Sequence, residues 1–101
     1  MSEAINQLVT KASIALNQGA FAELEVCAKQ ILQLNPNIAD AWFFLSLAAT
    51  ERRRVSVAIE LIDSALRLSP KNTEYIAQKA RLHTMSGQKE AAVAAADYAM
   101  S

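Results

Sequence analysis

Apolar residues recur along this chain at spacings of three and four, the period that places side chains on one side of an α-helix. Most of the segments with this pattern end at a glycine or before a proline, where a helix is hard to continue. The pattern therefore predicts an all-α chain of short helices, with Thr73 as the N-cap of the fifth. The expected helices cover residues 3–17, 21–34, 38–51, 55–68, 73–85 and 88–100, with Ser86-Gly87 separating the last two.

The chain also repeats itself at a period of 34 residues, since Leu32 and Pro36 recur as Leu66 and Pro70. Other residues spaced by 34 positions are similar in size or polarity without being identical. Two such sets are Ala12, Ser46 and Ala80, and Gly19, Arg53 and Gly87. Each period contains two helices, which pack antiparallel because their links are short. A single pair cannot bury its apolar faces, so we expect neighbouring pairs to stack as a solenoid.

A helix–turn–helix unit of 34 residues resembles the tetratricopeptide repeat (TPR). The middle unit carries the family's pattern as Trp42, Leu45, Ser46, Ala49, Ala58, Ile62, Ala65 and Pro70. The outer units depart from it, because Leu8 and Ile76 replace the Trp and Lys11 and Lys79 stand where Leu45 does. The resemblance implies an α-α superhelix of three antiparallel helix pairs. This superhelix is expected to form one domain over residues 1–101, with repeats at about 5–38, 39–72 and 73–101, the last of them truncated.

Small residues are expected at the contact between the two helices of the middle unit. Ser46 and Ala58 let the helix backbones approach closely, and Trp42 and Ile62 fill the space around that contact.

Charge and composition narrow the class of protein. Ten basic and ten acidic residues cancel, so no global field attracts nucleic acid or an acidic membrane surface. No apolar run reaches the roughly 18 residues that a membrane span requires, and the N-terminus lacks the pattern of a signal peptide. Cys27 is the one cysteine, which fits a reducing compartment. We therefore expect a cytoplasmic protein that binds neither nucleic acid nor a membrane.

The residues that carry chemistry are few and scattered. Cys27 and His83 fall on helices of different repeats. Cys27 is expected to be a small core or groove residue. The TPR resemblance implies that His83 is structural, because it stands where the family often has a tyrosine packed between helices. The carboxylates form no cluster for a metal, and two glycines cannot build a phosphate-binding loop. The sequence predicts a non-enzymatic chain without cofactor or metal. Arg52, Arg53 and Arg54 form the one charge run, which suits a solvated turn or, alternatively, a patch for a phosphate or an acidic partner.

By resemblance, the first helix of each TPR unit lines a concave groove that binds a partner. The partner-binding residues expected there are Val9, Ser13, Phe43, Phe44, Leu47, Gln78 and Arg81. The basic clamp by which chaperone adaptors of this family hold a C-terminal carboxylate is absent. Trp42, Phe43 and Phe44 cannot all face one core, so Phe43 or Phe44 is either a packing residue or an apolar anchor for a partner.

The last expected helix, residues 88–100, is rich in alanine and has little polar cover. We expect either a piece of a longer protein or a homodimer formed through this uncapped helix. The leading prediction is a protein–protein interaction module that binds a peptide or helix in the groove. The alternatives are an accessory domain of a larger enzyme and a small dimeric chaperone. The chain also bears a distant likeness to the N-terminal TPR segments of bacterial sulfotransferases.

Overall fold

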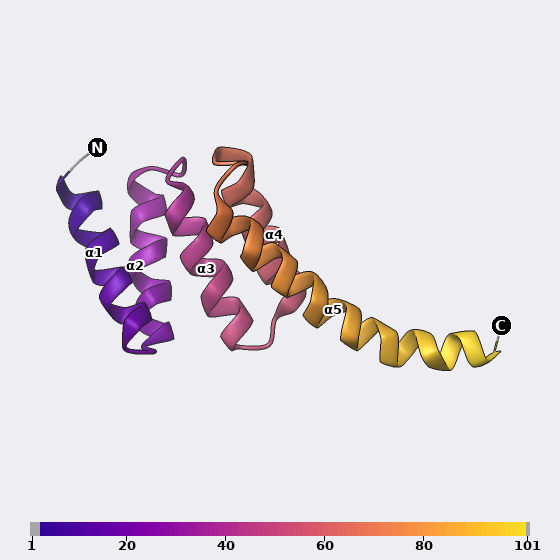
Figure 1. Cartoon of the computed structure of the whole chain (residues 1–101). Helices are drawn as coiled ribbons and strands as arrows, with labels where there is room; N and C mark the ends of the chain where they lie inside the picture. The colour runs from indigo at the N-terminus through magenta and orange to yellow at the C-terminus, as the bar shows by residue number, and fades with distance from the viewer. Residues whose placement is uncertain (1–2, 101) are drawn as a thin grey trace.

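Five α-helices account for the described part of the chain, which in this computed structural model covers the backbone of residues 3–100 and the side chains of residues 3–87. No strand occurs within residues 3–100. The all-α prediction is therefore confirmed, and the first four helices match their expected bounds within one residue. The helices are α1 (Glu3–Asn17), α2 (Phe21–Leu34), α3 (Ala39–Glu51), α4 (Val55–Leu68) and α5 (Thr73–Met100) (Figure 1).

The expected third helical pair is not formed, because α5 continues without a break through Ser86 and Gly87 over 28 residues. Glycine in a helix interior costs about 1 kcal/mol relative to alanine, which does not end a helix whose neighbours favour it. The residues after Gly87 are mainly Gln, Lys, Glu and Ala, all good helix formers. In Figure 1 the distal part of α5 runs away from α4. The expected homodimer surface concerns side chains of residues 88–100, which lie outside the described ones.

Two of the turns have the same hydrogen-bonding pattern, 34 positions apart in the sequence. After α1, Gly19 has φ 71° and the N–H of Ala20 donates to the carbonyl of Ala15 at 2.8 Å. After α3, Arg53 has φ 62° and the N–H of Arg54 donates to the carbonyl of Ala49 at 2.9 Å. Both are Schellman motifs, in which a left-handed residue ends a helix.

The N-terminus of α5 is capped by Asn72, and the expected cap Thr73 is instead the first helical residue. The Oδ1 atom of Asn72 accepts hydrogen bonds from the backbone N–H of Glu74 at 2.9 Å and of Tyr75 at 3.2 Å. An asparagine is among the strongest N-caps, so the prediction missed by one position.

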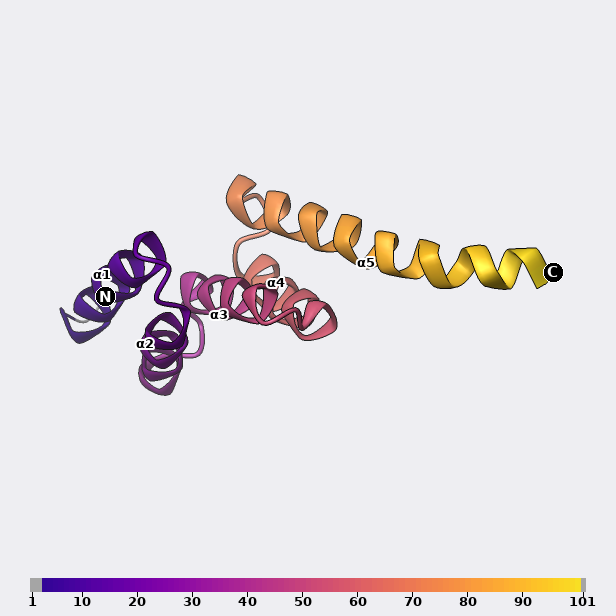
Figure 2. The same ribbon diagram turned by 90° about the horizontal axis from the view of Figure 1, so that it is seen from below.

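The helix α3 lies at the centre of the array, in contact with α1, α2 and α4. Its buried residues, Ala41, Phe44, Ser46, Ala48 and Ala49, point in several directions around the helix. One apolar cluster joins α3 to α1 and α2, and a second joins α3 to α4 and α5. Figure 2 shows α2 below α1, and the long α5 above α3 and α4. The fold therefore depends on α3, which contributes to both clusters.

The expected close contact between α3 and α4 is present. The Ser46 hydroxyl donates a hydrogen bond to the carbonyl oxygen of Ala58 at 2.9 Å, and both residues are fully buried. Ile62 is fully buried beside it, and the Trp42 ring packs against the same cluster. The Trp42 Nε1–H donates to the carbonyl of Pro36 at 2.9 Å, which ties the α2–α3 link to the start of α3.

Candidate functional site

The first turns of α5 are attached to α3 through Tyr75. Its side chain is 2% exposed, and its hydroxyl donates a hydrogen bond to the Asp40 carboxylate on α3. Its ring lies 5.0 Å from the Phe43 ring, centroid to centroid, at an angle of 38°. Burial, and then the hydrogen bond to Asp40, raise the pKa of Tyr75 above its ordinary value of 10.0. Phe43 is therefore held from one side by an aromatic side chain whose own position is fixed.

Gln78 forms a second link between α5 and α3, inside the protein. Its Nε2 donates to the Thr50 hydroxyl oxygen at 3.0 Å and, more weakly, to that of Ser46 at 3.4 Å. Both hydroxyl protons are already donated to backbone carbonyls, so these oxygens can only accept from Gln78. This fixes the orientation of the amide and leaves its Oε1 buried without a partner among the described residues.

The residues predicted to bind a partner divide into two groups. Phe44 is 5% exposed and Gln78 is 1% exposed, so neither side chain is available to a partner. Phe44 is a buried member of the cluster with α1 and α2, whereas Phe43, about 100° around the helix, packs against the edges of both clusters. The other five predicted residues keep part of their surface in solvent; they are Val9 and Ser13 on α1, Phe43 and Leu47 on α3, and Arg81 on α5.

We refer to these five residues, which come from α1, α3 and α5, as the α3 face. On α3 the partly buried Phe43 and Leu47 are one helical turn apart, and the exposed Asp40 and Glu51 continue the same row at either end. The row therefore presents an apolar centre between acidic ends.

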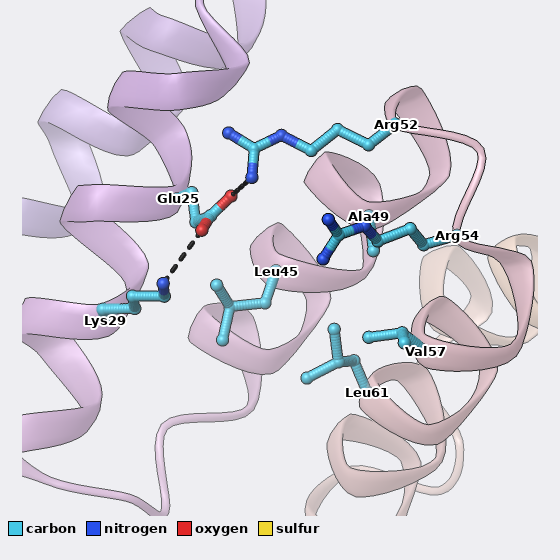
Figure 3. Close-up of a pocket in the computed structure, with 8 residues that line it drawn as sticks. All are labelled: Glu25, Lys29, Leu45, Ala49, Arg52, Arg54, Val57 and Leu61. Carbon is cyan, nitrogen blue, oxygen red and sulfur yellow. Dashed lines mark ion pairs between the residues drawn. The ribbon is translucent and has the colours of Figure 1, made fainter.

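A pocket lies on another side of α3, between α2 and α4 (Figure 3). Its volume is about 250 Å³. Apolar side chains of α3 and α4 form its floor, and charged side chains of α2 and the α3–α4 turn form its rim. The floor consists of Leu45, Ala49, Val57 and Leu61, and the rim of Glu25, Lys29, Arg52 and Arg54. We refer to it as the α2–α4 pocket.

The charges on this rim are partly paired. Glu25 accepts from Lys29 at 2.9 Å and from Arg52 at 2.6 Å (Figure 3). The hydrogen bond from Lys29, with the positive charges of Lys29, Arg52 and Arg54, lowers the pKa of Glu25 below its ordinary value. The Arg54 guanidinium itself has no hydrogen bond or ion pair to any described residue.

Cys27 and His83 differ in how far their side chains are buried. Cys27 is buried in the cluster of α1, α2 and α3, as expected. His83 is exposed, so the expectation that it packs between helices was wrong. Among residues 73–87 of α5 the buried positions are Tyr75, Gln78 and Leu82, and His83 lies about 100° around the helix from Leu82.

Two further findings concern the described residues as a whole. Within them, no group of three or more His, Cys, Asp or Glu side chains is close enough together to hold a metal ion. None of the helices searched over the same residues combines the length and apolar character needed to cross a membrane.

Comparison with models of known protein families finds no match to this chain, and comparison with curated proteins finds no similar sequence. The likeness to the TPR family therefore depends on the residue pattern and on the helix spacing.

Proposed function

We propose that the chain is a protein–protein interaction module of the TPR type, which binds an extended or helical segment of a partner protein on the α3 face. The observation that carries the proposal is the partial exposure of Phe43 and Leu47. Both belong to the central helix, yet both keep part of their surface in solvent, one turn apart. Apolar and aromatic side chains presented in this way are typical anchors of protein interfaces.

Three features support the TPR type. The first four helices follow the 34-residue period, with α1 and α3 as first helices and α2 and α4 as second helices of their units. The Schellman motifs at Gly19 and Arg53 occupy equivalent positions of the two units. The small residues Ser46 and Ala58 meet where the repeat pattern requires a close helix contact.

The surroundings of Phe43 favour a protein segment as the ligand. Tyr75 supports the Phe43 ring, so little side-chain freedom is lost when a partner covers it. Asp40 and Glu51, in the same row of α3, supply charged groups at the two ends of the apolar centre. An apolar centre within a polar rim is the ordinary anatomy of a protein interface.

Peptide selection followed by mutation tests this proposal. A displayed library of random peptides is selected against the protein, and the enriched peptide is synthesised with a fluorescent label. Its Kd is measured by fluorescence anisotropy. We expect Leu47→Asp to raise the Kd by at least about tenfold, because a carboxylate replaces an apolar contact at the interface centre.

The matched control is Val26→Asp, which makes the same kind of change at a 54%-exposed position of α2 outside both surfaces. It is expected to leave the Kd unchanged. Circular dichroism verifies that both variants keep their helical structure. If the folded Leu47→Asp variant binds the peptide as the wild type does, the α3 face is not the binding site.

A further inference from the structure

The α2–α4 pocket lies apart from the α3 face, and none of the described side chains of α1 and α5 lines it. Leu45 on its floor is two residues from Leu47 on the α3 face, which is a rotation of about 200° around the helix. The two surfaces therefore point to opposite sides of α3. A ligand in this pocket is independent of one on the α3 face.

The size of the pocket limits what can enter it. Its volume of about 250 Å³ lies below the roughly 300–1,000 Å³ of sites that enclose drug-sized ligands. Val57 on the floor remains 44% exposed, so a ligand in the pocket has apolar surface to contact. These dimensions suit one large apolar side chain of a partner better than a cofactor.

The charges on the rim indicate the sign of the ligand. Three cations face one carboxylate, so the rim carries an excess of positive charge in a chain whose net charge is zero. Lys29 and Arg52 already pair with Glu25, whereas Arg54 has no such partner among the described residues. In Figure 3 the Arg54 side chain extends from the α3–α4 turn past Ala49, toward the side on which Glu25 and Lys29 of α2 lie. A guanidinium in this position can bind a carboxylate through two parallel hydrogen bonds.

We propose that the α2–α4 pocket binds an acidic segment of a partner protein. An apolar side chain such as leucine enters between Val57 and Leu61, and a neighbouring aspartate or glutamate pairs with Arg54. The apolar contact supplies binding energy, and the ion pair orients the segment and speeds association. This inference extends the proposed function to a second surface.

Short labelled peptides with blocked ends provide the probe. The first has a central leucine flanked on each side by glutamate and aspartate. Two others keep its length, one with serine in place of the leucine and one with lysine in place of the acids. We expect saturable binding of the first, weakened by added salt, and a Kd at least about tenfold higher for the other two.

Two charge reversals in one turn supply the matched variants. Arg54→Glu is expected to raise the Kd of the acidic peptide by at least about tenfold, because it repels the carboxylate that Arg54 binds. Arg53→Glu changes the net charge equally at the next residue, which does not line the pocket, and is expected to change the Kd by less than about threefold. Arg54 precedes the first turn of α4, where an acidic residue suits the helix dipole, so the variant should fold.

Three results would overturn the proposal. The first is an equal loss of affinity in both variants, which would show attraction to the loop charge and not to the pocket. The second is binding of sodium decanoate with the same dependence on Arg54, together with no binding of the acidic peptide. The third is unaltered peptide binding by Arg54→Glu or, if that variant unfolds, by Arg54→Gln. Leu47→Asp should not affect this peptide, so failure here is distinct from failure at the α3 face.

Discussion

Arg53 adopts a backbone conformation that glycine adopts at lower cost. Its φ of 62° is close to the 71° of Gly19, and both residues end a helix in the same hydrogen-bonded motif. The left-handed conformation costs a non-glycine residue about 1–2 kcal/mol. Gly19 and Arg53 therefore occupy the same structural position of the two repeat units. Glycine suits this position, whereas arginine is strained there.

Arg53→Gly should raise the free energy of unfolding by about 1 kcal/mol, because it relieves this strain. Urea denaturation followed by circular dichroism measures the change. Arg53→Ala is the control, since it removes the same side chain without relieving the backbone. An equal gain in Arg53→Ala would assign the effect to the loss of charge and would contradict the conformational explanation.

Glu25 gives the stability of the fold a dependence on acid. Its pKa in the folded protein lies below the value of 4.5 that it has without partners. Its contribution is therefore complete above pH 4.5 and is lost as the pH falls through the folded pKa, because the unfolded chain binds the proton first. We expect Glu25→Gln to be less stable by under about 1 kcal/mol at neutral pH, since the ion pairs are only partly shielded from solvent.

Denaturation of both proteins at a series of pH values from about 7 to about 3 measures this contribution. The difference between wild type and Glu25→Gln should shrink as the pH falls, and also at high salt. A difference that stays constant or grows in acid would contradict the assignment.

For individual residues, the sequence predicted contacts between the two helices of one repeat unit but not contacts between different units. The contact of Ser46 with Ala58 follows from two small residues on consecutive helices. The bond of Tyr75 to Asp40 depends on how α5 lies across α3, which no local pattern encodes. For the pocket the sequence offered only the run Arg52 to Arg54; it did not indicate that Glu25 and Lys29 of α2 lie opposite.

At the scale of elements, the starts and ends of the first four helices were predictable because their links carry strong signals. Prolines follow α2 and α4, and a glycine in the left-handed conformation follows α1. Gly87 resembles Gly19 in sequence, but it has no left-handed backbone and lies within α5. A glycine permits a turn without requiring one. The predicted helix break at Ser86-Gly87 was therefore wrong, because the helix propensity of the residues on both sides outweighs the cost of one glycine.

The same substitution at the two glycines should have opposite effects. Gly87→Ala should increase helix content and raise the free energy of unfolding by up to about 1 kcal/mol, because alanine favours a helix and a Cβ there meets nothing within 4 Å. Gly19→Ala should lower stability by about 1 kcal/mol, because its φ is 71°.

Thermal unfolding and circular dichroism of both variants decide between the continuous helix and the hairpin predicted from sequence. A left-handed turn at Gly87 would make Gly87→Ala destabilising as well. That result would contradict the uninterrupted α5.

At the scale of the whole molecule, α3 determines both the stability of the fold and the surfaces it offers. The helix belongs to both apolar clusters, so most of its sides are covered. The sequence indicated that Phe43 and Phe44 could not both join one core; the positions of α1, α2 and α5 decided that Phe44 is buried and Phe43 partly exposed. The uncovered surface of α3 lies on two sides. One side carries the apolar and acidic row of the α3 face, and the other lines the positively charged α2–α4 pocket.

Heteronuclear NMR, which locates the selected peptide on the protein, tests most directly whether the α3 face binds a partner. Unlabelled peptide is added to ¹⁵N-labelled protein, and the shifts of the backbone amide signals are followed. We predict the largest shifts at Val9, Ser13, Phe43, Leu47 and Arg81, on three separate helices. Shifts confined to other residues, or spread evenly over the chain, would contradict the proposal that the α3 face binds a partner.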